Sequence, residues 1–152
     1  MSLADVTDYA SFYKWFDGLE LDVYELWCSV YDGVDTMMWG QNIGFSPYNS
    51  GRLLNWDNDT YPSLSLLDET MGNECDAELM KTHFISMLKY LRDNGEITEM
   101  MGVDGLGYDA IIESIESDGL NICGFAIIAK PDMLIELSRD PAVSYIYTTP
   151  AY

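Results

Sequence analysis

Carboxylates are the side chains of this sequence whose number and spacing could support chemistry. There are twenty-six Asp and Glu against seven Lys and Arg, which gives a formal net charge of −19 over 152 residues. Clustered carboxylates bind hard cations, act as general acids and bases, or pair with lysine and arginine of another molecule. The spacing of these acids and their neighbours indicates which use is favoured.

A calcium loop is the first use to consider, because Asp57-Asn58-Asp59 resembles the start of one. The sixth position of an EF-hand loop is Gly and the twelfth is Glu, whereas this chain has Pro62 and Asp68 there. The EF-hand interpretation therefore fails. A looser divalent-cation site stays open as an alternative, because hard cations need only clustered oxygens. We expect no metal site and no cofactor.

Nucleophilic catalysis has little support in the sequence. His83 is the single histidine, and no nucleophile is marked near it, so an ordinary surface or half-buried helix residue is favoured over a catalytic base. Cys28, Cys75 and Cys123 are widely spaced without a CxxC pair, which argues against a disulfide framework and a zinc site of ordinary spacing. We expect no catalytic residues and a reducing compartment.

The segment 56–61 combines two aromatic residues with two acids. Trp56 and Tyr61 flank Asp57 and Asp59. Aromatic side chains are enriched at binding hot spots, and carboxylates pair with a partner's Arg or Lys. The alternative is that the two rings only anchor a long loop to the core. We predict a partner-binding loop here.

Two acidic stripes follow helical spacing. The first supports the loop in the predicted partner-binding site and consists of Asp109, Glu113 and Glu116. These positions share one helix face, and no nearby base is expected to compensate them. The second stripe, kept as the next candidate, consists of Asp132, Glu136 and Asp140. A charged solvent face is the simpler explanation for either stripe alone.

The elements that position these residues are predicted from hydrophobic periodicity and from turn residues. We expect helices at 5–17, 21–31, 75–93, 108–117 and 131–139, the first two forming an antiparallel pair. We expect strands at 121–129 and 143–148, a weak extended segment at 96–103, and an irregular stretch at 35–66 with short strands near 36–39 and 52–56.

These elements predict one α+β domain over residues 1–152. Helices should pack on a small sheet, with a strand-helix-strand unit near the end of the chain. Hydrophobic residues make up 48% of the chain and aromatic residues 13%, so it can bury a core without disulfides or metals. The first residues lack a signal-peptide pattern, and no apolar run is long enough to span a bilayer, so we expect a cytoplasmic protein.

The net charge narrows the class of partner. So acidic a protein repels nucleic acid and anionic membranes, and its field favours encounters with basic proteins. The leading hypothesis is a non-catalytic binding protein that neutralises a basic partner, such as an immunity protein for a nuclease-type toxin or a DNA-mimic inhibitor. The alternatives are a metal-dependent hydrolase built on clustered Asp and Glu, or an adaptor whose charge, like that of a halophilic protein, serves only solubility.

Overall fold

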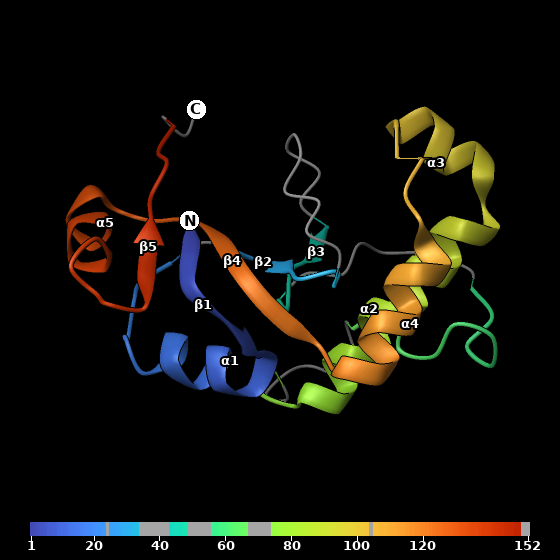
Figure 1. Ribbon diagram of the computed structural model, residues 1–152, viewed down its shortest axis with the longest axis horizontal. Helices are drawn as coiled ribbons and strands as arrows, with labels where there is room; N and C mark the ends of the chain where they lie inside the picture. The colour runs from blue at the N-terminus through green and yellow to red at the C-terminus, as the bar shows by residue number, and fades with distance from the viewer. Residues whose placement is uncertain (24, 34–42, 49–55, 67–73, 104, 150–152) are drawn as a thin grey trace.

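The computed structural model describes residues 1–23, 25–33, 43–48, 56–66, 74–103 and 105–149 (Figure 1). The short strands expected near 36–39 and 52–56 lie outside these residues, except for Trp56. In chain order the elements are β1 (Ser2–Asp8), α1 (Tyr9–Asp17), β2 (Glu25–Val30), β3 (Gly44–Phe45), α2 (Ala77–Asp93), α3 (Gly95–Met101), α4 (Tyr108–Asp118), β4 (Asn121–Ile128), α5 (Pro131–Leu137) and β5 (Val143–Tyr145). The predicted α+β class is confirmed.

The strands form one sheet in the order β3-β2-β4-β1-β5, and every neighbouring pair is antiparallel. β4 and β5 both pair with β1, so they run parallel to each other with β1 between them. The expected strand-helix-strand order of β4, α5 and β5 is therefore present, although its two strands are not neighbours. The last strand is also shorter than expected, because pairing with β1 stops at Tyr145.

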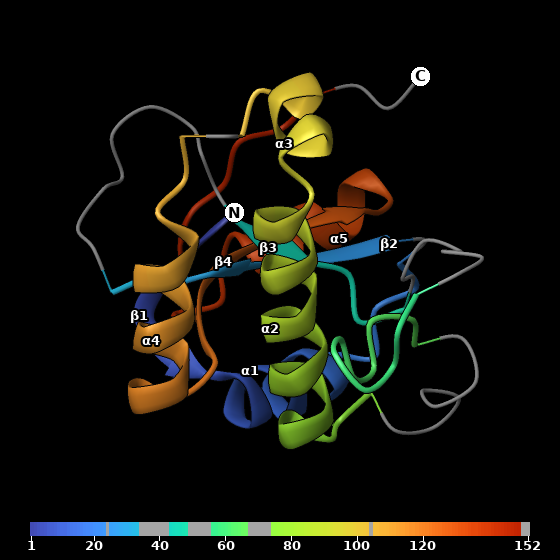
Figure 2. The same ribbon diagram turned by 90° about the vertical axis from the view of Figure 1, so that its right-hand side faces the viewer.

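One hydrophobic core joins the sheet to its helices. Helix α1 contributes Phe12 and Phe16, whose rings pack against Phe125 of β4 with centroids 5.7 Å from it in both cases. Helices α2 and α4 add further buried side chains to the same core. Figure 2 shows α2 in front of the strands with α4 beside it, so both helices present their outer sides to solvent.

The first two predicted helices are corrected by the structure. Residues 2–8 form a strand, and helix begins only at Tyr9, where the carboxylate of Asp8 accepts a hydrogen bond from the amide of Ser11 at 2.9 Å. The segment 21–31 contains β2 instead of a helix. In β2 the side chains of Leu26 and Cys28 are buried while Glu25 and Trp27 are exposed, which is the alternation of a strand.

The extended segment predicted at 96–103 is also corrected by the structure. We expected an extended chain, but Gly95–Met101 is helical, and its end is capped by Gly102 with φ of 69°. Glutamate and methionine favour a helix in this segment. Asn94 interrupts the helical conformation only at the boundary between α2 and α3. The predicted helices at 75–93, 108–117 and 131–139 and the strand at 121–129 are confirmed within a few residues. Among the described residues, no helix has the length and apolar composition to cross a bilayer.

Candidate interface for a basic partner

The 56–61 loop is organised by its own acid. The carboxylate of Asp57 accepts the amide of Asp59 at 3.1 Å and the hydroxyl of Thr60 at 2.6 Å. Both hydrogen bonds hold the pKa of Asp57 below its usual range, and the one from Thr60 has the larger effect. Asp57 therefore shapes the turn, as short acids commonly do, and Asp59 is left exposed on its outer side.

Trp56 is half-buried rather than displayed. Its indole Nε1 is inaccessible to solvent and finds no hydrogen-bond acceptor among the described residues. A buried donor without an acceptor costs stability. The ring is therefore partly buried and partly at the surface, and both interpretations made from the sequence stay open.

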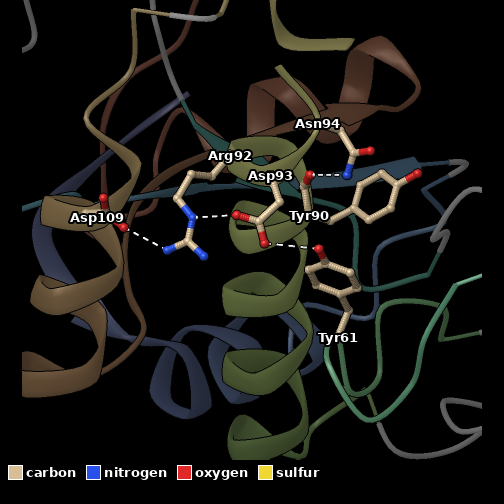
Figure 3. Close-up of polar contacts among 6 residues, drawn as sticks. All are labelled: Tyr61, Tyr90, Arg92, Asp93, Asn94 and Asp109. Atoms are coloured by element: carbon tan, nitrogen blue, oxygen red, sulfur yellow. Dashed lines mark hydrogen bonds and ion pairs between the residues drawn. The ribbon is translucent and has the colours of Figure 1, made fainter. Parts of the chain in front are cut away.

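Tyr61 links the loop to the end of α2. Its ring packs edge-on against Tyr90, with centroids 5.4 Å apart. Its hydroxyl donates to Oδ2 of Asp93 at 3.0 Å (Figure 3). This hydrogen bond to a carboxylate raises the pKa of Tyr61, so the tyrosine stays a donor at neutral pH. Sequence analysis did not identify Asp93 as a member of the site.

Arg92 connects that contact to α4. Its Nε lies 2.8 Å from Oδ1 of Asp93, and its Nη1 lies 2.7 Å from Oδ1 of Asp109 (Figure 3). The guanidinium lowers the pKa of Asp93, and the two carboxylates in turn raise the pKa of Arg92. A continuous polar chain therefore runs from the 56–61 loop across α2 to α4.

The first acidic stripe lies on the outer side of α4, as the spacing predicts. Asp109, Glu113 and Glu116 are all exposed. The expectation that no base compensates them is wrong, because Arg92 pairs with Asp109 and Lys89 lies 3.7 Å from Glu116. Lys81, Lys89 and Arg92 fall on one face of α2, a spacing visible in the sequence that could have revealed these pairs.

Comparison of the chain with protein-family models, with curated proteins and with solved structures finds no match. The contacts themselves are therefore the basis for assigning a function. The name acidic surface is used below for the residues of the 56–61 loop, the end of α2 and the outer side of α4 that these contacts connect. They are Trp56, Asp57, Asp59, Tyr61, Asp93, Asp109, Glu113 and Glu116.

The second acidic stripe is divided by the fold. Asp140 lies beyond the end of α5, where its carboxylate accepts the indole N–H of Trp15 at 3.3 Å and the amide of Ala142 at 2.8 Å. It therefore holds the turn between α5 and β5. Asp132 and Glu136 remain exposed on α5.

His83 has a structural position inside the core. It is 3% exposed, and its Nδ1 lies 2.8 Å from the carbonyl oxygen of Ser63. Burial lowers the pKa of His83, so the ring is neutral at pH 7 and donates from Nδ1 to that carbonyl. The sequence predicted that His83 lies at the surface or is half-buried, but the structure shows it more deeply buried. It ties α2 to the segment that follows the 56–61 loop.

The metal-ligating and cysteine side chains are dispersed over the described part of the fold. Over the described residues, no three His, Cys, Asp or Glu side chains gather closely enough to hold a metal ion. All three cysteines are free: Cys28 is buried, Cys75 is exposed and Cys123 is half-buried.

Proposed function

We propose that this protein is a non-catalytic binding protein that neutralises a basic protein, and that it does so through the acidic surface. The observation that supports this proposal is the polar chain from Tyr61 through Asp93 and Arg92 to Asp109. It brings the 56–61 loop and α4, which are far apart in the sequence, onto one side of the molecule.

The acidic surface combines charge with partly exposed aromatic rings. Its carboxylates can pair with Arg and Lys of a partner, and Trp56 and Tyr61 provide apolar area that can be desolvated on binding. Arg92 pairs with Asp109 and Lys89 with Glu116, while Lys81 donates to the backbone carbonyl of Glu116. The surface has six carboxylates against these three bases, so it keeps a negative charge. Preorganised carboxylates lose less side-chain entropy when a partner binds.

Electrostatic occlusion is the proposed mechanism. A nucleic-acid enzyme has a positive groove for phosphates, and an acidic protein that fills this groove excludes the nucleic acid. The net charge of −19 accelerates the encounter through its long-range field. An immunity protein for a nuclease-type toxin and a DNA-mimic inhibitor both act in this way.

Affinity capture from the source organism, followed by stopped-flow binding of the captured protein, tests this proposal. We expect a basic partner whose association rate falls steeply as salt rises, because screening shortens the range of the field. DNA or RNA should compete with this protein for the partner. A neutral or acidic partner that associates at the same rate at low and high salt would overturn the proposal.

A further inference from the structure

A second recognition feature lies at the end of the sheet away from α4. β4 begins next to α4 and runs toward α5 (Figure 1). A hollow of about 530 Å³ opens near the last residues of β4. The hollow is formed by β2, β4 and the chain that follows β3. Six of its lining residues are Glu25, Trp27, Ser46, Tyr48, Ala126 and Ile128.

The strand register accounts for one wall of the hollow. Glu25 pairs with Ile128 and Trp27 pairs with Ala126, so alternate residues of two neighbouring strands point to the same side of the sheet. On that side Trp27 is 42% exposed and Ile128 is 41% exposed. A large aromatic ring and a carboxylate two residues apart are therefore presented together.

Gly44 of β3 fixes the place of the Trp27 indole. A Cβ at position 44 would lie 2.5 Å from Nε1 of Trp27 and would also collide with the carbonyl oxygen of Cys28. Only glycine lets the indole lie this close to the neighbouring strand. The indole therefore lies directly against the backbone of β3.

Tyr48 also lines the hollow. Its side chain is exposed, and its hydroxyl lies 3.5 Å from that of Tyr13 on α1. Glu25 is the charged residue among those lining the hollow. Lys130, two residues beyond the end of β4, is paired with Asp22 at 3.1 Å. The hollow therefore combines two aromatic side chains with a carboxylate that no described base neutralises.

We propose that this hollow receives the guanidinium of an arginine side chain from the basic partner. Aromatic faces attract cations, and a carboxylate beside them adds a charge-assisted hydrogen bond. Arginine fits better than lysine, because its planar group stacks on rings and offers paired N–H donors to a carboxylate. This inference depends on the proposed function for its partner, but the site is separate from the acidic surface.

Titration with N-acetyl-arginine methylamide tests the site directly, with the indole N–H signal of Trp27 followed by NMR. The signal is assigned by its loss in Trp27→Phe. We expect a saturable shift, with roughly tenfold weaker binding in Glu25→Gln and in Tyr48→Leu, as the loss of a cation–aromatic or charged contact implies. N-acetyl-lysine methylamide should bind more weakly than the arginine compound.

Glu136→Gln is the matched control, because it removes the same charge from an exposed position on α5. It should bind the arginine compound like the parent. Equal weakening in Glu25→Gln and Glu136→Gln would show a general charge effect and overturn the site. So would a shift of Trp27 that is linear in ligand concentration, or equal binding of the lysine compound.

The captured partner separates the two proposals. If Glu25→Gln and Tyr48→Leu bind the partner like the parent while variants of the acidic surface bind poorly, the arginine site is wrong and the proposed function stands. If the arginine compound fills the hollow but no basic protein shows salt-dependent association, the proposed function is wrong and the arginine site stands.

Discussion

The guanidinium of Arg92 lies 2.7 Å from the carboxylate of Asp109, and this contact ties the end of α2 to the first turn of α4. The side chain of Asp109 is 83% exposed, so the pair is surrounded by water. Exposed ion pairs contribute at most about 1 kcal/mol to folding stability. The contact is therefore more important for where the carboxylate lies than for how stable the fold is.

Removing a positive charge and adding one at or beside the acidic surface should change the association rate with a basic partner in opposite directions. Arg92→Gln removes a base from the acidic surface and should speed association a few-fold at low salt. Glu113→Lys should slow it by a similar factor, because rim charges act mainly on the encounter. Stopped-flow measurements at two salt concentrations check both. Equal rates for both variants at low salt would contradict the assignment of this surface.

Trp56 should carry much of the binding free energy. Trp56→Ala is expected to weaken binding by roughly 2 kcal/mol or more, as truncation of a buried aromatic anchor does. Because the indole is half-buried in the free protein, thermal melts must accompany the calorimetry. Trp56→Phe keeps an aromatic ring and is the control for folding. A folded Trp56→Ala that binds like the parent would remove the loop from the interface.

The free energy of unfolding should depend on pH through His83. Its folded pKa lies below the ordinary value of about 6.5, because the ring is buried. Above that pH the histidine is neutral in both states and its contribution is complete. Below it the unfolded chain takes up a proton that the folded chain lacks, so stability falls by at most about 1.4 kcal/mol per pH unit.

Denaturant titrations between pH 5 and 7.5, on the parent and on His83→Gln, isolate this effect. The difference in unfolding free energy between the two proteins should shrink as the pH falls. The acids with lowered pKa values, such as Asp57 and Asp93, titrate at lower pH and should not interfere. A difference that stays constant over this range would show that the histidine is not held neutral.

Cysteine labelling should report the burial of β2. Burial raises the pKa of the Cys28 thiol to about 12, and the thiolate is the reactive form. Iodoacetamide at pH 8 should therefore label exposed Cys75 first and reach Cys28 only when denaturant is added. Peptide mass spectrometry measures each site. Native-state labelling of Cys28 as fast as that of Cys75 would contradict the packing of β2.

No enzymatic turnover is expected. If the protein acts only by binding, as proposed, screens with esterase, phosphatase, nuclease and glycosidase substrates should stay at background with Mg²⁺, Mn²⁺ and Zn²⁺ present. Asp59→Asn serves as the comparison variant. An activity that survives purification and is lost in this variant would favour a carboxylate-based enzyme instead.

The parts of the fold that the sequence predicts well are those with one clear periodicity. The 75–93 helix has an apolar face and a capping acid, Asp76, whose carboxylate accepts two amides of the first turn. The 21–31 segment was ambiguous, because Leu26 and Val30 fit a helix face and a strand face equally well. Pairing of β2 with β4 decided the structure there, and that pairing is not visible locally.

The candidate site shows the same division. The 56–61 loop and the α4 stripe could be identified from residue types and spacing. Their connection could not, because it depends on Arg92 reaching two acids on different helices, a contact set by how α2 packs on α4. The hollow beside Trp27 was missed for a similar reason, since β2 was expected to be a helix.

The place of β1 in the sheet has a consequence for how the chain is made. Ser2 pairs with Gly124 on one side and with Tyr145 on the other, so among the described strands β1 is made before both of its partners, β4 and β5. Such non-local pairing slows folding, and β1 must wait for β4 and then for β5 before its two edges are paired. Completion of the sheet is therefore a late step that follows translation of β5, and a nascent chain stalled before residue 121 should remain open to proteases.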